Sequence, residues 1–263
     1  MSGSAEPRSV LYEIKDGVGT ITLNRPNVLN ALNTDLAFEL ADAAEHAAKD
    51  PDVWVVVVKG AGRAFSSGMD RTALARNEIG EAFFRHWTRA LNALEDMDKL
   101  VVCVCHGYCI GGGLQLAVAC DVRLSTEDAI LGLGATEHGL VPDGSILRLA
   151  RIIGLARAKE LTLLNDHIRA EEARAMGLVN WVAATVDVPA KLRTILERAF
   201  QTSRTATGHA KRLLHQSFHT DPRALVEEVL RAQADCMASW EIREANRAWQ
   251  EQRPARYYPP PRD

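Results

Sequence analysis

The chain has 263 residues, of which 47% are hydrophobic, 25% charged and 6% aromatic. This composition excludes a disordered chain, a collagen-like repeat and a small disulfide-stapled scaffold, and the length allows one or two domains. Lys and Arg number 31 against 34 Asp and Glu, so the formal net charge is -3 and we expect neither nucleic acid nor an anionic membrane as a partner.

Residues 1–9 carry no apolar signal core, and we predict a disordered lead-in there. The longest apolar runs, residues 53–58 and 100–105, are far shorter than the roughly 18 residues of a membrane span. These two observations favour a location in the cytoplasm.

The first half of the chain alternates strand and helix patterns. Strands are predicted at residues 10–15, 18–24, 53–59 and 100–105. Asp16 and Gly17 form the expected hairpin turn between the first two strands. Thr34 is the expected N-cap of a helix that runs to about Lys49.

Helical patterns dominate the rest of the chain. Residues 71–97 predict one or two helices, with Gly80 as the candidate break. A glycine-rich bend at residues 107–113 leads into another helix, and beyond residue 143 only residues 178–182 indicate a further strand. The pattern is typical of an α/β layer followed by helices.

The cysteines favour a reduced protein without a metal site. None of the five forms a C-x-x-C pair, and an odd number fits a disulfide framework poorly. Cys103 and Cys105 share one face of a predicted strand. We therefore expect buried, reduced thiols.

Two loops rich in small residues follow predicted strands. Gly111, Gly112 and Gly113 allow the backbone to approach a ligand closely, and amides at a helix start are unpaired and stabilise negative charge. The loop at residues 65–70 is the second. Together they could offer two amides to one oxygen, as an oxyanion hole requires. The alternative is that both are ordinary turns with close helix packing.

Six motifs in order resemble those of the crotonase, or enoyl-CoA hydratase/isomerase, superfamily. The resemblance covers about residues 10–253. Each motif alone is weak, but the ordered set is specific. The motifs are residues 24–32 (NRPNVLNAL), 60–70 (GAGRAFSSGMD), 107–121 (GYCIGGGLQLAVACD), 139–143 (GLVPD), 170–179 (AEEARAMGLV) and 249–254 (WQEQRP).

This resemblance implies a fold and an assembly. The expected architecture is a spiral of ββα units over residues 10–190, followed by a helical trimerisation region over residues 191–263. Family members usually form homotrimers or homohexamers and bind an acyl-CoA thioester, so coenzyme A arrives as part of the substrate. The resemblance implies no metal and no redox cofactor.

The resemblance also implies site residues. The amides of Met69 and Gly112 would form the oxyanion hole that holds the thioester oxygen as it becomes an enolate. Contacts to the adenine and pantetheine parts of coenzyme A would come from residues near the first and second motifs. These residues are Val28, Leu29, Ser66, Ser67, Gly68 and Asp70.

The sequence departs from the hydratase pattern at both glutamate positions. A hydratase of this family uses one carboxylate to orient water and another to protonate carbon. Gln115 and Ala135 occupy these positions here. Gln can orient a water or a carbonyl group but carries no proton at neutral pH, and Ala does neither. The two-carboxylate mechanism therefore does not carry over.

Two other acids are candidates for proton transfer. Asp143 matches an aspartate that dienoyl-CoA isomerases use as an acid and that aroyl-CoA dehalogenases use as a nucleophile. Its Pro-Asp-Gly context equally suits a turn or a helix cap. Glu137 would share a face with Ala135 if that segment is extended, with His138 facing the opposite way. A solvated surface glutamate is the alternative.

The favoured function is isomerase- or lyase-type proton transfer on an acyl-CoA, with Asp143 and Glu137 as the acid-base candidates. Three alternatives stay open: hydration through a rearranged site, hydrolysis or dehalogenation with Asp143 as nucleophile, and acyl-CoA binding without catalysis. The acyl group is not readable from the sequence. We expect its pocket to include Leu74, Phe83, Phe84 and Trp87.

Overall fold

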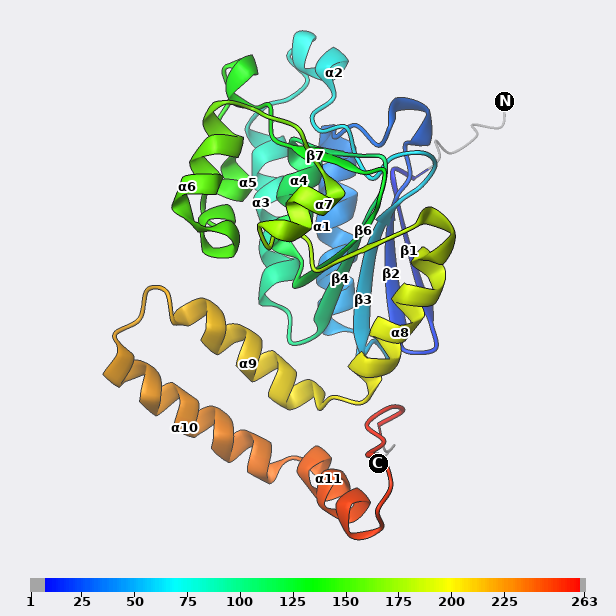
Figure 1. Ribbon diagram of the computed structural model, residues 1–263, viewed down its shortest axis with the longest axis vertical. Helices are drawn as coiled ribbons and strands as arrows, with labels where there is room; N and C mark the ends of the chain where they lie inside the picture. The colour runs from blue at the N-terminus through cyan, green and yellow to red at the C-terminus, as the bar shows by residue number, and fades with distance from the viewer. Residues whose placement is uncertain (1–7, 261–263) are drawn as a thin grey trace.

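Two β-sheets of different size organise residues 8–260, which the computed structural model describes (Figure 1). The larger sheet has the order β1-β2-β3-β4-β6-β9, in which β1 and β2 are antiparallel and all other neighbours are parallel. Its strands are β1 (Val10–Lys15), β2 (Val18–Leu23), β3 (Val55–Gly60), β4 (Leu100–Cys105), β6 (Val122–Thr126) and β9 (Trp181–Ala183). The smaller sheet contains β5 (Tyr108–Ile110), β7 (Ile130–Gly132) and β8 (Ile168–Arg169).

Helices cover both faces of the larger sheet. α1 (Thr34–Lys49) and α3 (Glu81–Asp96) pack on one face, where their apolar residues join the main hydrophobic core. α8 (Val188–Phe200) covers the other face through Ile195 and Ala199, as Figure 1 shows. β3 and β4 are apolar along nearly their whole length because strands in the middle of a parallel sheet are buried on both faces.

The chain winds as a spiral between the two sheets. After β4 it turns into β5, and after β6 it turns into β7, so successive units place one strand in each sheet. Isolated β-bridges connect successive turns of the spiral: Leu32 pairs with Met69, and Ser66 pairs with Cys109 of β5. This arrangement confirms the predicted α/β fold, a spiral of ββα units followed by helices.

Further helices fill the connections and form the C-terminal region. In the spiral they are η1 (Pro26–Val28), α2 (Arg71–Ala75), α4 (Gly112–Ala119), η2 (Thr136–His138), α5 (Asp143–Ile146), α6 (Leu149–Leu163), α7 (Ala170–Ala175) and η3 (Thr185–Asp187). After α8 follow α9 (Arg204–Gln216), α10 (Pro222–Ala238) and α11 (Trp240–Gln250). No helix between residues 8 and 260 combines the length and apolar character that a membrane span requires.

The predicted elements and the structure agree over most of the first half. Gly80 is the N-cap of α3, so it does separate two helices. The N-cap prediction for α1 is wrong, because the side chain of Asn33 accepts the Leu36 N–H while Thr34 is the first helical residue. The short strands β5 to β8 were not predicted, since strands of two to five residues show too little periodicity. The predicted lead-in falls largely outside the described residues.

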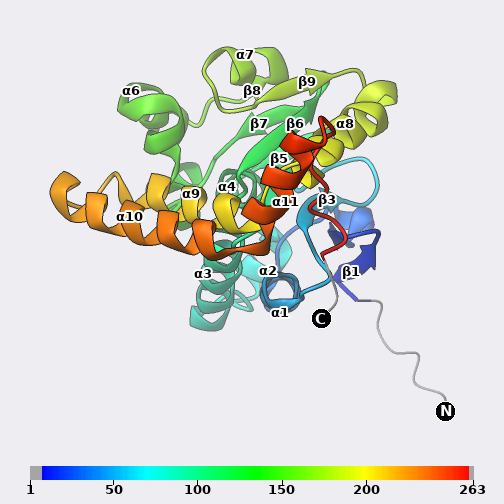
Figure 2. The same cartoon turned by 90° about the horizontal axis from the view of Figure 1, so that it is seen from below.

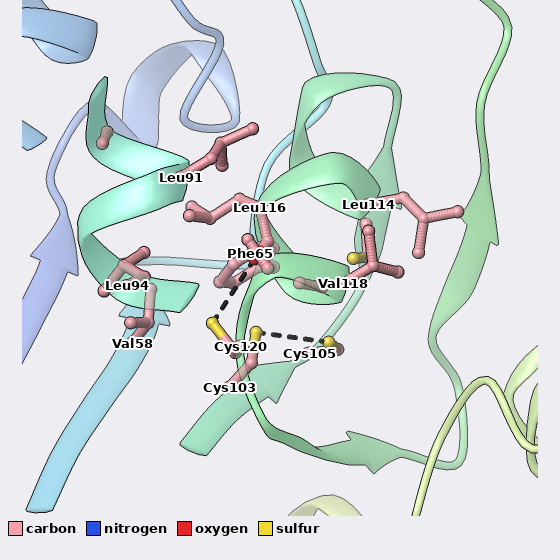
Figure 3. Packing of buried hydrophobic residues seen from close by; sticks show 14 of the residues in the cluster. Val58, Phe65, Leu91, Leu94, Cys103, Cys105, Leu114, Leu116, Val118 and Cys120 are labelled. Atoms are coloured by element: carbon pink, nitrogen blue, oxygen red, sulfur yellow. Dashed lines mark hydrogen bonds between the residues drawn. The ribbon is translucent and has the colours of Figure 1, made fainter. Parts of the chain in front are cut away.

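The cysteines are free thiols, as predicted. Cys103, Cys105, Cys109 and Cys120 are buried, and Figure 3 shows three of them within the apolar core. The sulfur atoms of Cys103 and Cys105 lie 3.6 Å apart. Among residues 8–260, no group of three or more His, Cys, Asp or Glu is placed to hold a metal ion.

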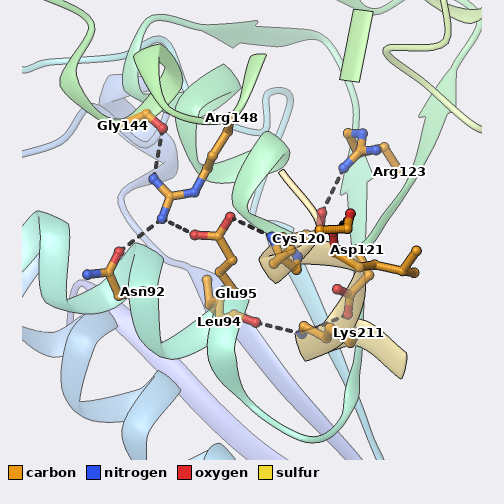
Figure 4. A network of polar contacts seen from close by, with 12 residues as sticks. Asn92, Leu94, Glu95, Cys120, Asp121, Arg123, Gly144, Arg148 and Lys211 are labelled. Carbon is orange, nitrogen blue, oxygen red and sulfur yellow. Dashed lines mark hydrogen bonds and ion pairs between the residues drawn. The ribbon is translucent and has the colours of Figure 1, made fainter. Parts of the chain in front are cut away.

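The C-terminal helices extend away from the sheets. Figures 1 and 2 show α9 below the larger sheet, with α10 running back along α9 in the opposite direction. A buried lysine attaches α9 to the core: the ammonium of Lys211 donates to the Leu94 and Lys99 carbonyl oxygens and, at 2.9 Å, to the Asp121 carboxylate (Figure 4). Asp121 also accepts the N–H of Val101 at the start of β4. Both charged groups are largely buried, so removing either one would leave the other buried without its ion-pair partner.

We expect Lys211→Met to lower the free energy of unfolding by about 3 kcal/mol, because it leaves the Asp121 carboxylate buried and unpaired. Chemical denaturation at fixed protein concentration measures the change. Lys159→Met, on an exposed part of α6, is the matched control and should have little effect. The double variant with Asp121→Asn should regain part of the loss. Equal stability of Lys211→Met and the control would contradict the assignment.

Candidate active site

A cavity of about 610 Å³ opens where the spiral meets the helical segments α2, α3, η2 and α5. One wall consists of apolar side chains from α2 and α3. The four residues expected in the acyl pocket all line it: Leu74, Phe83, Phe84 and Trp87. Phe83 and Trp87 are stacked, with ring centroids 6.1 Å apart. The cavity combines an apolar wall with a few polar groups, as small-molecule sites commonly do.

Met69 and Gly112 both line the cavity. Within the described residues, neither N–H donates to another protein group. Met69 is bridged to Leu32, but the flanking Gly68 and Asp70 make those hydrogen bonds, so its own N–H remains available. Gly112 is the first residue of α4, where an N–H has no partner within the helix. Two residues with unpaired backbone N–H groups therefore line one cavity.

Two glycines bring together the two loops that carry Met69 and Gly112. Gly68 and Gly111 both have positive φ, and a Cβ on Gly68 would lie 3.4 Å from the Gly111 Cα and 3.0 Å from the Ile110 oxygen. The two loops thus meet backbone to backbone. Such an approach at φ > 0 requires residues without a side chain. The glycines at positions 68 and 111 therefore allow the contact between the two loops that line the cavity.

The loop of the second motif divides into lining and supporting residues. Ser67 and Gly68 line the cavity. Ser66 is fully buried, and its hydroxyl donates to the Asn30 carbonyl and accepts the Gly68 N–H, so it supports the loop. Asp70 caps α2 and pairs with Arg25 at 3.0 Å.

The remaining two residues expected to contact coenzyme A lie next to the cavity. Val28 and Leu29 do not line it, although the Leu29 carbonyl accepts the N–H of Ser67 in the cavity wall. The Val28 side chain is exposed. Val28 is the last residue of η1 and Leu29 is its C-cap, so η1 places both residues beside the loop that carries Ser67.

Gln115 lies in the cavity wall and is almost fully buried. Its side-chain oxygen accepts two hydrogen bonds, from the Trp87 indole N–H at 3.2 Å and from the Gly144 N–H at 2.9 Å. That oxygen therefore links α4 to α3 and to α5. Its amide nitrogen donates no hydrogen bond among the described residues, and this group is the one that remains for a ligand.

Asp143 lines the same cavity as the first residue of α5. Its side chain does not cap this helix, so the capping role considered from the sequence is wrong. Burial raises the pKa of the Asp143 carboxyl, while the N–H groups of Gly144 and Asp143 and the charge of Arg148 oppose the rise. A half-buried carboxyl with an elevated pKa, facing a cavity, is typical of acid-base residues.

Glu137 also lines the cavity, but not for the predicted reason. Ala135 has helical backbone angles and residues 136–138 form a 3-10 helix, so the segment is not extended. His138, expected to face away, lines the cavity as well. His167 was missed, because it reaches the cavity from the turn before β8 and no local pattern marks it.

Comparisons with known proteins place the chain in one family. The sequence profile of the family described as enoyl-CoA hydratase/isomerase matches residues 13–259. The chain is 28% identical over 257 residues to a crotonyl-CoA hydratase of Syntrophomonas wolfei, covering 95% of this chain and 97% of that protein. It is 35% identical over 177 residues to a peroxisomal Delta(3,5)-Delta(2,4)-dienoyl-CoA isomerase of Arabidopsis thaliana, covering 62% of this chain and 64% of that protein.

The fold comparison leads to the same group of proteins. The crystal structure of an enoyl-CoA hydratase from Mycobacterium smegmatis matches with a TM-score of 0.88 at 27% identity, covering 96% of this chain and 100% of that one. The family profile spans nearly the whole chain. The chain therefore belongs to the enoyl-CoA hydratase/isomerase, or crotonase, family and is an enzyme that acts on acyl-CoA.

Proposed function

We propose that this enzyme moves a proton along the acyl chain of an acyl-CoA thioester, as an isomerase or related lyase, with Asp143 as the acid-base group. The observation that carries the proposal is a half-buried Asp143 carboxyl in the cavity that also contains the unpaired amides of Met69 and Gly112. The absence of carboxylates at Gln115 and Ala135 supports one-carboxylate chemistry over hydration.

The proposed reaction has two proton transfers. The ionised Asp143 removes a proton from a carbon conjugated with the thioester, and the C–H electron pair moves into the thioester carbonyl to give an enolate. The N–H groups of Met69 and Gly112 stabilise the charge on that oxygen. The protonated Asp143 then returns the proton to another carbon as the carbonyl re-forms. Atoms and charge balance without a cofactor.

The other cavity residues take supporting roles in this proposal. Ser67 and Gly68 line the cavity and contact the thioester end of coenzyme A, with Val28 and Leu29 next to them. The apolar wall around Phe83 holds the acyl chain. Glu137 lines the same cavity and is a second carboxylate that assists Asp143.

We also propose a homotrimer or homohexamer, assembled through the C-terminal helices. Several apolar side chains on these helices are exposed in the single chain, and large exposed apolar patches mark interaction sites. They are Leu214, Phe218, Val226, Val229, Leu230, Met237 and Trp249. The cytoplasmic location stays a prediction, because relatives include proteins named as mitochondrial and peroxisomal.

Hydration is the second candidate, favoured by the similarity to a crotonyl-CoA hydratase. It would use Asp143 and Glu137 as its two carboxylates, since both line the cavity. Formation of a 3-hydroxyacyl thioester from a crotonyl thioester distinguishes it from isomerisation. A covalent adduct on Asp143 would instead indicate hydrolysis or dehalogenation.

We expect Asp143→Asn to lower proton transfer by at least about 100-fold while leaving binding of a CoA thioester intact, because the amide cannot accept the proton. Deuterium incorporation from D₂O into enoyl and dienoyl thioesters, followed by mass spectrometry, measures transfer, and calorimetry measures binding. Glu137→Gln is the matched control and should cause a smaller loss. Full activity of Asp143→Asn would exclude this carboxyl as the acid-base group.

The pH dependence of the reaction should follow the ionisation of Asp143. Only the ionised carboxyl accepts a proton, so kcat/KM rises with pH through its pKa and becomes constant above it. Because burial raises the pKa of Asp143, this rise should lie above the range of an ordinary aspartate. A rate that stays constant to pH values below that range would contradict the prediction.

The Gly112 amide can be tested by removing its hydrogen. A Cβ on Gly112 would lie 2.2 Å from the Leu32 side chain, so both variants are made in a Leu32→Ala background. Gly112→Pro removes the N–H at a helix position that tolerates proline, whereas Gly112→Ala keeps it. We expect turnover of the proline variant to be about 100-fold lower than that of the alanine variant. Equal turnover would show that this amide does not hold the oxyanion.

A further inference from the structure

We propose that Gln115 and Arg148 are positioning residues that hold the backbone on either side of Gly144 and thereby fix the Asp143 carboxyl in the cavity. The inference rests on the proposed role of Asp143. Neither residue transfers a proton in this scheme. Instead, both act through the backbone of the short helix that carries the reacting group.

Gly144 is held through both of its backbone polar groups. Its N–H donates to the Gln115 side-chain oxygen at 2.9 Å, and its carbonyl accepts from the Arg148 guanidinium at 2.9 Å. Gln115 comes from α4 and Arg148 from the turn before α6, so two separate elements hold one residue. Since Asp143 directly precedes Gly144, these bonds also orient the carboxyl.

Both side chains are themselves fixed by α3. Gln115 accepts the Trp87 indole N–H, and Arg148 donates to the Asn92 side chain at 2.9 Å. Arg148 also pairs with Glu95, as Figure 4 shows. Arg148 is only 6% exposed, so its planar guanidinium is held in one orientation.

Gly144 is tightly packed between these two supports. A Cβ on Gly144 would lie 2.4 Å from the Leu91 side chain and 2.7 Å from the Gln115 oxygen, so a larger residue would displace one of them. Gly144 is buried. Backbone hydrogen bonds shielded in this way resist displacement and give the preceding carboxyl a defined position.

The two supports act on Asp143 in opposite directions. The positive charge of Arg148 lowers the pKa of Asp143, so its removal raises that pKa. The Gly144 N–H also lowers this pKa, but it is shared with the Gln115 oxygen. Removing that oxygen leaves the N–H to Asp143 alone and lowers its pKa further.

Other ionisable side chains line the same cavity and are unchanged in both variants. Arg71 reaches it from α2, and His167 reaches it from the turn before β8. Glu137 and His138 reach it from η2. Among the described residues none of these four side chains hydrogen-bonds to Gly144, so opposite shifts in the two variants would be specific to the two supports.

The test is a carbon-13 NMR titration of the full chain labelled at aspartate Cγ, with the Asp143 signal assigned by its loss in Asp143→Asn. We expect the ionisation midpoint to rise in Arg148→Met and to fall in Gln115→Met. Arg157→Met, on an exposed part of α6, is the control and should match the wild type. Arg148→Lys keeps the charge and should restore most of the midpoint. In the deuterium-incorporation assay, the kcat of both Met variants should be about 100-fold lower than that of the wild type, with little change in KM.

Wild-type midpoints in both Met variants, with folding confirmed by circular dichroism, would overturn the inference. If Arg148→Met does not fold because Glu95 is left buried without its partner, Glu95→Gln with Arg148→Met carries the same expectation. Absence of deuterium exchange in the wild type would overturn the proposed function alone. The NMR midpoints would still decide the inference, because they need no turnover.

Discussion

The contact between successive turns of the spiral is the constraint on which the site depends. Met69 lies beside Leu32, and Ser66 lies beside Cys109, so the loop at residues 66–70 is placed by the turns before and after it. Gly68 and Gly111 then touch through backbone atoms alone. Two N–H groups that are far apart in the chain consequently reach one cavity, with no side chain needed to bring them together.

The same architecture separates the two requirements of the proposed chemistry. In the proposal, backbone donors stabilise the charge on the thioester oxygen, and no substitution other than proline removes a backbone N–H. Proton transfer is assigned to a side chain that lines the same cavity from the short helix α5. This division allows members of one family to change the acid-base group while keeping the part that binds the thioester, as Gln115 and Ala135 indicate here.

The sequence predicted the large features well because they arise from long, regular patterns. The strands at residues 10–15 and 100–105 and the break at Gly80 follow from local periodicity and backbone preference. The apolar cavity wall was also anticipated from α3, although only through the family resemblance. Asp143 was recognised as a candidate, yet its freedom from a capping role became visible only with its neighbours in place.

What the sequence could not predict are contacts between residues far apart in the chain. Gln115 was interpreted from its chemistry alone, whereas its oxygen is used by Trp87 and Gly144. Whether the segment around Glu137 is extended was left open, and it forms a 3-10 helix. His167 reaches the cavity through the topology of the smaller sheet, which leaves no periodic signal.

Glu95 connects the site to the C-terminal helices. Its carboxylate pairs with Arg148 on one side and lies 3.4 Å from the His215 ring on α9 on the other. A shift of α9 would therefore change the surroundings of the arginine behind Asp143. Glu95 thus provides a short chain of contacts from the C-terminal helices to the carboxyl proposed to transfer the proton.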